Sequence, residues 1–235
     1  MSKTLEIGSI YQFGGYDWRV LDVEDNRALL ISEKILAKRP YNTEQKNITW
    51  ENCTLRNELN AEFYNQIPHS DRIKIVKTPV ENKKNEWYNT DAGNNTEDYI
   101  FLLSIEESEK YFGNTDKYHS EKEKSINRWR EIGGAMEKAN EAASKLDSKK
   151  PYPHSEGFKD IDHYMGLGFF STGYEADRVA TYGKNEPCSW WLRTPGPHKN
   201  HATTVCQHGM VWPGVGGNVV EKLGVRPALW LNLDA

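Results

Sequence analysis

The chain has 235 residues and a formal net charge of −4 at pH 7, with a pI of about 6.0 and a mean hydropathy of −0.79. This balance excludes the basic field that a nucleic-acid backbone requires, and no segment approaches the roughly 18 apolar residues of a membrane-spanning helix. Eight tryptophans and twelve tyrosines supply apolar area for a core and exclude a disordered chain.

The cysteines and the N-terminal segment indicate the cellular compartment in which we expect the protein. The chain has three widely spaced cysteines, and an odd number at such spacing argues against a disulfide framework. Residues 1–8 contain no apolar run of secretory length. We therefore expect a cytoplasmic protein with reduced thiols, although earlier removal of a signal peptide would change that expectation.

The first thirty residues predict a meander of strands. Residues 10–13 lead into Gly14-Gly15, a hairpin turn signal, and residues 18–23 then alternate apolar and polar side chains. Residues 28–31 are wholly apolar, as in a central strand. These patterns indicate a β-rich N-terminal region.

A helix is predicted over about residues 55–65, with Thr54 as its N-cap, because apolar residues recur there every four positions. Residues 73–80 predict a strand. Residues 99–103 are a second apolar run, for which we expect a buried strand.

A capping box follows that second run. Ser104 and Glu107 have the spacing in which each side chain caps the other's backbone, and Gly113 is a stop signal. The sequence therefore predicts a short helix that begins after Ser104 and ends at Gly113.

Residues 114–176 differ from the rest of the chain. A capping box of Ser120 and Glu123 and an apolar stripe predict a long amphipathic helix that reaches about residue 147. We expect the stripe to pack on the chain's own core. The alternative is a surface for a partner on the helix around 121–147.

The C-terminal residues return to β structure. Residues 202–206 and 210–212 flank His208-Gly209, a hairpin signal, and residues 225–233 predict the last strand. Arg193 and Arg226 lie within apolar strand motifs. We therefore expect backbone carbonyls or a buried carboxylate to hold them in a structural role.

Several short motifs occur in order along the chain: Trp18-Arg19-Val20-Leu21, Ala28-Leu29-Leu30-Ile31-Ser32, Cys53-Thr54-Leu55-Arg56, Trp190-Trp191-Leu192-Arg193-Thr194-Pro195-Gly196 and Gly224-Val225-Arg226-Pro227-Ala228-Leu229. Together they resemble an uncharacterised group of bacterial domains. The resemblance implies an α+β fold similar to C-type lectin-like domains and formylglycine-generating enzymes, with a twisted antiparallel sheet, few helices and long loops. It covers residues 5–113 and 177–233, so we expect a single domain, 1–235, interrupted by a helical insertion at about 114–176.

The metal chemistries of that superfamily do not match this sequence. The copper site of formylglycine-generating enzymes needs two closely spaced cysteines, whereas Cys188 and Cys206 are far apart in the chain. No His-x3-His-x-Glu arrangement of the related iron enzymes occurs. The calcium loop of lectins would be Glu186-Pro187-Cys188, in which a thiol replaces the ligating amide. We therefore expect no metal or other cofactor and no catalytic residue.

The sequence thus predicts a non-catalytic recognition module. Rigid strands beneath variable loops form a binding platform, so we expect a protein, peptide or glycan ligand to bind the C-terminal loops. Trp212 is the best candidate for an exposed aromatic, because a proline and a glycine-rich loop follow it. The predicted ligand-binding residues are Trp212, His198, Lys199, His201 and His208.

Two other functions stay open. The first is a metal-dependent enzyme, because thiolate and imidazole groups are zinc ligands, although their spacing fits no closed zinc motif. Its ligands would come from Cys188, His198, His201, Cys206 and His208. The second is a regulatory or inhibitory protein that docks a larger assembly through the inserted helix.

Overall fold

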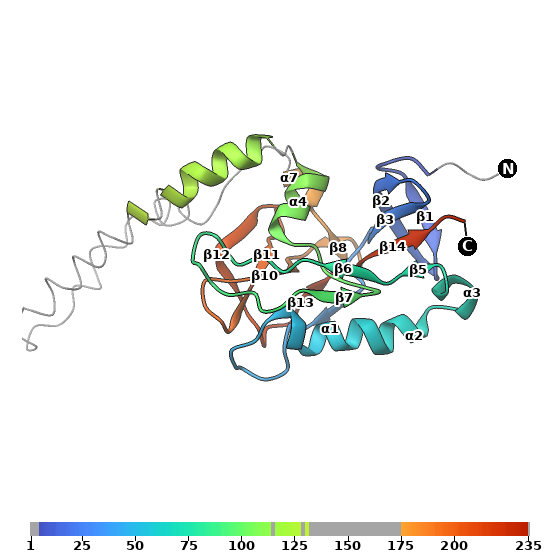
Figure 1. The fold of residues 1–235 in the computed structure, drawn as a ribbon, viewed down its shortest axis with the longest axis horizontal. Helices are drawn as coiled ribbons and strands as arrows, with labels where there is room; N and C mark the ends of the chain where they lie inside the picture. Colours follow the sequence, from blue (N-terminus) through green and yellow to red (C-terminus); the bar gives the residue numbers. More distant parts are fainter. Residues whose placement is uncertain (1–4, 114–115, 128–129, 132–174, 235) are drawn as a thin grey trace, which may run out of the picture.

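The computed structural model describes residues 5–113, 116–127, 130–131 and 175–234. Figure 1 shows two sheets with a few short helices on their flanks. Each sheet has five strands, and two two-stranded hairpins accompany them. Among the described strands all pairings are antiparallel except that of β10 with β13. The predicted mixed α+β class is confirmed.

The first sheet joins the two ends of the chain. Its strand order is β1 (Ile10–Phe13), β2 (Tyr16–Glu24), β3 (Arg27–Ser32), β14 (Ala228–Asn232) and β5 (Ile75–Val76). The predicted N-terminal meander is confirmed, with Gly14 and Gly15 at positive φ in its first turn. Strand β14 pairs with β3 along its whole length, and the C-terminal strand therefore lies inside the sheet, between β3 and β5.

The second sheet is built mainly from C-terminal residues. Its order is β12 (Val211–Asn218), β11 (His201–Val205), β10 (Trp190–Pro195), β13 (Leu223–Val225) and β4 (Ala37–Arg39). The prediction of one final strand over 225–233 is wrong. The run divides at Arg226-Pro227, because proline has no N–H for a strand ladder, and β13 and β14 enter different sheets.

The predicted helix over 55–65 is confirmed as one helical run. It consists of α1 (Thr54–Glu58), a π-helical turn η2 (Leu59–Phe63) and α2 (Tyr64–Gln66), preceded by the 3-10 turn η1 (Trp50–Asn52) and followed by α3 (His69–Arg72). The predicted N-cap is wrong by one residue. The Cys53 sulfur accepts from Arg56 N at 3.4 Å, while Thr54 Oγ1 accepts from Thr43 N at 3.0 Å.

Helix α4 (Ile105–Phe112) begins at the predicted capping box. Ser104 Oγ accepts from Glu107 N at 3.1 Å, and Glu107 Oε2 accepts from Ser104 N at 2.8 Å. The strand predicted over 99–103 is wrong, although that run is largely buried. It makes one isolated bridge, and the Asn60 amide takes up backbone groups of Tyr99 and Ile100 that a neighbouring strand would otherwise bind.

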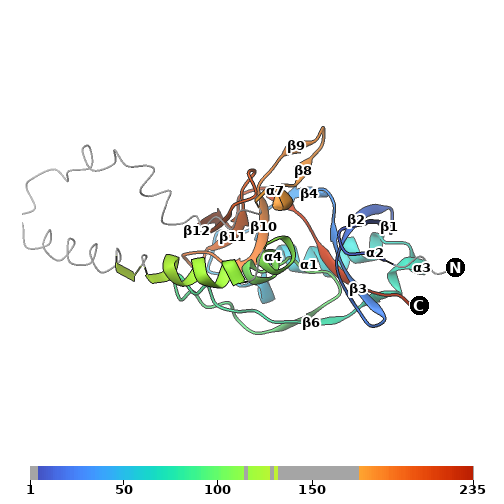
Figure 2. The ribbon, with the colours of Figure 1, turned by 90° about the horizontal axis from the view of Figure 1, so that it is seen from above.

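The remaining short elements lie beside the two sheets. They are the hairpin β6 (Thr78–Val80) with β7 (Thr96–Asp98), the helix α7 (Glu175–Arg178), and the hairpin β8 (Thr181–Tyr182) with β9 (Glu186–Pro187). The strand predicted over 73–80 is therefore two short strands, β5 and β6, in different sheets. Figure 2 shows the β8–β9 hairpin projecting from the body of the fold. In the described part of the chain, no helix has the length and apolar character to span a bilayer.

The start of the predicted insertion is helical over 116–127 and 130–131. Ser120 therefore lies within this helix, which corrects its prediction as an N-cap. Tyr118 and Ile126 are buried in the main hydrophobic cluster, so this part of the stripe packs on the chain's own core. Residues 132–174, and with them the rest of the predicted helix, lie outside the described residues.

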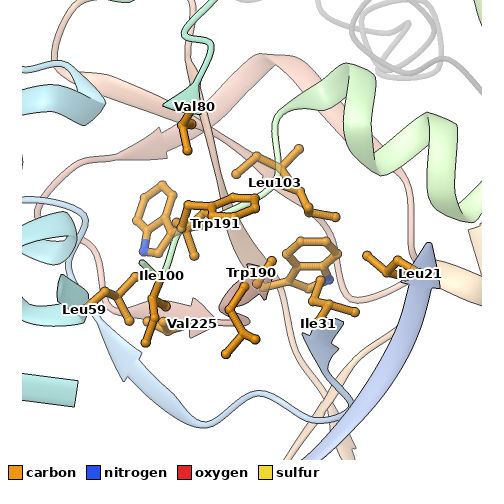
Figure 3. Packing of buried hydrophobic residues seen from close by; sticks show 14 of the residues in the cluster. Leu21, Ile31, Leu59, Val80, Ile100, Leu103, Trp190, Trp191 and Val225 are labelled. Carbon is orange, nitrogen blue, oxygen red and sulfur yellow. The ribbon is translucent and has the colours of Figure 1, made fainter. Parts of the chain in front are cut away.

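Strand β10 is buried on both faces. Its adjacent tryptophans, Trp190 and Trp191, are each 0% exposed. In Figure 3 the Trp190 ring lies near Ile31 and Leu21, whereas Trp191 lies on the other side, toward Leu59. Neither indole is available as a surface platform, and both form the centre of the core.

A tight turn joins β11 to β12, as the sequence predicts at His208-Gly209. Gly209 has φ of +82°, and a Cβ there would lie 1.7 Å from the backbone oxygen of Glu175. We expect Gly209→Ala to destabilise the protein by about 2 kcal/mol or more, since both the backbone angle and the close approach disfavour a side chain. Urea unfolding followed by circular dichroism measures this. Gly183→Ala is the matched control, because Gly183 also has positive φ but open space around it; equal losses in the two variants would contradict the close-approach argument.

Candidate functional site

Arg193 joins β10 to the start of α4. It donates to Leu102 O at 2.7 Å and to Glu81 O at 3.0 Å, and it forms a bidentate ion pair with Glu107. Burial alone would raise the pKa of Glu107, but the Arg193 charge and the Ser104 hydrogen bonds outweigh it and lower that pKa. The predicted structural role of Arg193 is confirmed.

A cavity of about 480 Å³ lies next to this ion pair. We call it the α4 cavity. Its walls come from the loop 81–87, from the first turns of α4, from the helical residues 116–127, and from the end of β10. Charged wall residues include Lys83, Lys84, Glu86, Glu106 and Lys110, and the aromatic ones are Trp87, Tyr111 and Tyr118.

Asn85 fixes the loop wall of the α4 cavity. It is fully buried, and its Nδ2 donates to Pro195 O at 2.9 Å and to Pro213 O at 3.0 Å. Its Oδ1 accepts from Trp87 N at 3.0 Å. Because one amide binds its own loop and two strands, β10 and β12, the wall is preorganised by the second sheet behind it.

Charges of both signs are held at the rim of the α4 cavity. Glu106 pairs with Lys83 at 2.9 Å and with Lys122 at 3.7 Å, and Lys122 pairs with Glu86 at 3.0 Å. The hydrogen bond to Glu106 raises the pKa of Lys83. The pairs fix where each charge lies. The Lys83 side chain is half exposed and remains available to a ligand, whereas the Lys122 side chain is largely buried.

The aromatic wall residues add flat apolar surfaces with polar tips. Trp87 Nε1 donates to Ser125 Oγ at 2.9 Å, which ties the loop to the helix of 116–127. Burial raises the pKa of Tyr111 and of Tyr118, so both phenols carry their proton at neutral pH. Rings of this kind suit stacking against planar amide groups.

Three of the predicted binding residues lie together in the turn between β10 and β11, which we call the histidine turn. The rings of His198 and His201 have centroids 5.4 Å apart, and Lys199 is exposed between them. Burial and the neighbouring His198 charge lower the pKa of His201. The Lys199 carbonyl accepts from Ile48 N at 2.9 Å, so the turn is anchored.

The other two predicted residues lie elsewhere. His201 begins β11, whereas His208 follows the far end of that strand, whose length is about 13 Å at the usual rise per residue. Backbone pairing places Trp212 opposite Thr204 and Asn218 opposite His201. The structure thus groups His198, Lys199 and His201 but does not bring His208 to them.

The cysteine and histidine cluster is not assembled as a ligand set. The Cys206 sulfur accepts from His208 N at 3.3 Å, and the Cys188 thiol donates to Ser189 O at 3.3 Å. Within the described ranges no group of three or more His, Cys, Asp or Glu side chains is placed to hold a metal ion.

No pattern in the sequence indicated the residues of the α4 cavity as a site. Ser104 and Glu107 signalled a helix start, and that reading is correct, but Glu106 and Lys110 on the same helix also face the cavity. The loop residues Lys83 and Lys84 carry no pattern that separates them from solvated lysines. Only the fold brings these segments together.

The fold and these sites define a mixed α+β domain. The family described as DUF6273, a domain of unknown function, matches residues 25–233. The chain belongs to this family, in agreement with the predicted uncharacterised group. Comparison with the curated proteins yielded no match, and none of the solved structures matched either.

Proposed function

We propose that this protein is a non-catalytic recognition module and that its ligand is a short peptide segment bound in the α4 cavity. One observation carries the proposal: fixed charges of both signs surround a cavity walled by aromatic rings. A peptide offers planar amides to such rings and charged side chains to such a rim. The volume of about 480 Å³ lies within the usual range of ligand sites.

The pairing of the charges supports binding rather than catalysis. Lys83 and Lys122 each pair with a carboxylate, and Arg193 is held by Glu107. Groups held in ion pairs keep their charge at neutral pH, whereas a general acid or base must exchange its proton near that pH. The cavity therefore supplies fixed charge.

The scaffold belongs to the same proposal. The few helices, the antiparallel sheets and the long loops support a C-type lectin-like arrangement, in which loops carry the ligand site. The C-terminal strands β10 and β12 contribute through Thr194 in the cavity wall and through the Asn85 contacts. The histidine turn, which the sequence singled out, is the rival site.

A displayed library of random peptides, selected against the full chain, tests the proposal. We expect selected peptides to bind the variant K84E/K110E at least about tenfold more weakly. Reversing the two charges turns attractive contacts with the peptide into repulsive ones, which changes the binding free energy by more than about 1 kcal/mol. Fluorescence anisotropy of labelled peptides measures the change.

Two comparison variants locate the site. Lys46→Glu and Lys77→Glu reverse exposed charges away from the cavity, and we expect them to leave the affinity unchanged. The variant H198A/H201A removes the rings of the histidine turn. If it abolishes binding while K84E/K110E does not, the ligand binds the histidine turn and the α4 cavity assignment is wrong.

A further inference from the structure

Three arginines are buried in the described part of the fold, and two of them have a carboxylate partner. Arg178 pairs with Glu109 at 3.0 Å, and Arg193 pairs with Glu107. Arg226, which is 1% exposed, has no ion pair in the described ranges. Arg226 is therefore the one buried arginine of the described residues whose charge no side-chain ion pair balances.

The hydrogen bonds of Arg226 leave one nitrogen unused. Nε donates to Ser32 O at 2.9 Å and Nη2 donates to Glu33 O at 3.5 Å, which confirms the predicted brace. Nη1 is buried without a hydrogen-bond partner. A buried cation with an unused donor is costly unless an anion or acceptor compensates it.

The aromatic rings around Arg226 compensate only part of that cost. The guanidinium carbon lies 5.3 Å from the Trp190 ring centroid and 5.0 Å from that of Phe112. Burial lowers the pKa of Arg226 to about 10, so the group is still charged at neutral pH. The site therefore holds a full positive charge that makes no ion pair of its own in the described ranges, although the nearby Glu33 carboxylate offsets part of the effect of burial on its pKa.

Arg226 lines a cavity of about 390 Å³ that is separate from the α4 cavity along most of its wall. We call it the Arg226 cavity. Part of its wall is apolar, from Val20, Leu21, Phe112 and Val179. A polar edge carries Arg19, Glu33 and Asp177.

The carboxylates at this edge are not directed at Arg226. Glu33 binds Arg19 through both oxygens, at 2.6 and 2.8 Å, and Asp177 is exposed. The one hydrogen bond between Glu33 and Arg226 is made by the backbone oxygen of Glu33, not by its carboxylate. The Arg226 cavity thus combines apolar walls, a buried guanidinium and an anion position that no described side chain fills.

We propose that the Arg226 cavity binds a small organic carboxylate with an apolar body. Its carboxylate accepts from Arg226 Nη1, and its apolar part packs against Leu21 and Phe112. Because Nη1 is shielded from solvent, binding requires the Arg19–Glu33 pair to shift. Arg19 then supplies a second cationic group to the ligand.

Calorimetric titration of the full chain with benzoate, and with neutral benzamide as its matched analogue, tests this. We expect saturable binding of benzoate and at least about tenfold weaker binding of benzamide, because only the carboxylate forms a charge-assisted hydrogen bond. Arg226→Met should weaken benzoate binding by about tenfold or more, whereas Glu33→Gln should strengthen it by removing a competing negative charge. Arg27→Met, which alters an exposed arginine, should change nothing. Equal binding of benzoate and benzamide, or no saturable binding of benzoate, would overturn the proposal.

A crystallographic experiment locates the bound carboxylate directly, so the proposal can still be tested if Arg226→Met does not fold. Crystals of the unaltered protein soaked in 4-bromobenzoate should show bromine anomalous scattering within the Arg226 cavity. Bromine in the α4 cavity, or no ordered bromine, would overturn the carboxylate site and leave the peptide proposal standing. The peptide affinity of K84E/K110E does not depend on the carboxylate site. The peptide proposal and the carboxylate proposal can therefore be refuted separately.

Discussion

Replacing Arg178 by methionine is expected to lower the free energy of unfolding by about 3–5 kcal/mol, because the change leaves the Glu109 carboxylate buried without its cation. Both side chains are fully buried, with Nη1 and Oε2 3.0 Å apart. Arg178 Nε also donates to Gly209 O at 2.7 Å. This one guanidinium therefore links α7, α4 and the β11–β12 turn.

Urea unfolding followed by far-ultraviolet circular dichroism measures the effect. The matched control is Arg27→Met, which breaks the surface pair with Glu24 and should cost less than about 1 kcal/mol. The double variant R178M/E109M removes both charges, and we expect it to recover much of the lost stability. If R178M were no less stable than R27M, or if R178M/E109M were no more stable than R178M, the Arg178–Glu109 pair would be accessible to water.

Local signals predicted the elements that depend on neighbouring residues. Gly14-Gly15 fixes the turn of the meander, and Ser104 with Glu107 fixes the start of α4, because turn and cap geometry involve only a few adjacent residues. Predictions failed where a distant group decides the structure. The run 99–103 is not a strand because the Asn60 side chain binds its backbone, and no periodicity in the run reports that.

The same distinction explains the sites. The apolar surroundings of Arg193 and Arg226 in the sequence correctly predicted their bracing role, since a buried arginine must bind carbonyls or carboxylates. Closeness in sequence misled the grouping of His208 with His201, because a strand separates them. The α4 cavity gathers four segments that lie far apart in the chain, so no local pattern could predict it.

Trp190→Ala is expected to lower the free energy of unfolding by about 3–5 kcal/mol, as large-to-small changes at fully buried aromatic positions do. The indole is 0% exposed, and its Nε1 donates to Arg178 O at 3.1 Å. Trp191 is equally buried, but its Nε1 donates to Arg39 O at 2.9 Å. The two adjacent indoles thus bind different segments on opposite faces of β10.

Circular dichroism during urea unfolding measures these losses without depending on tryptophan fluorescence. Tyr182→Ala is the control, since that ring is 38% exposed and its removal should cost under about 1 kcal/mol. Because the indoles lie on opposite faces, we expect the losses from Trp190→Phe and Trp191→Phe to add in the double variant to within about 0.5 kcal/mol. Strong coupling between them would mean that the rings share one packing environment.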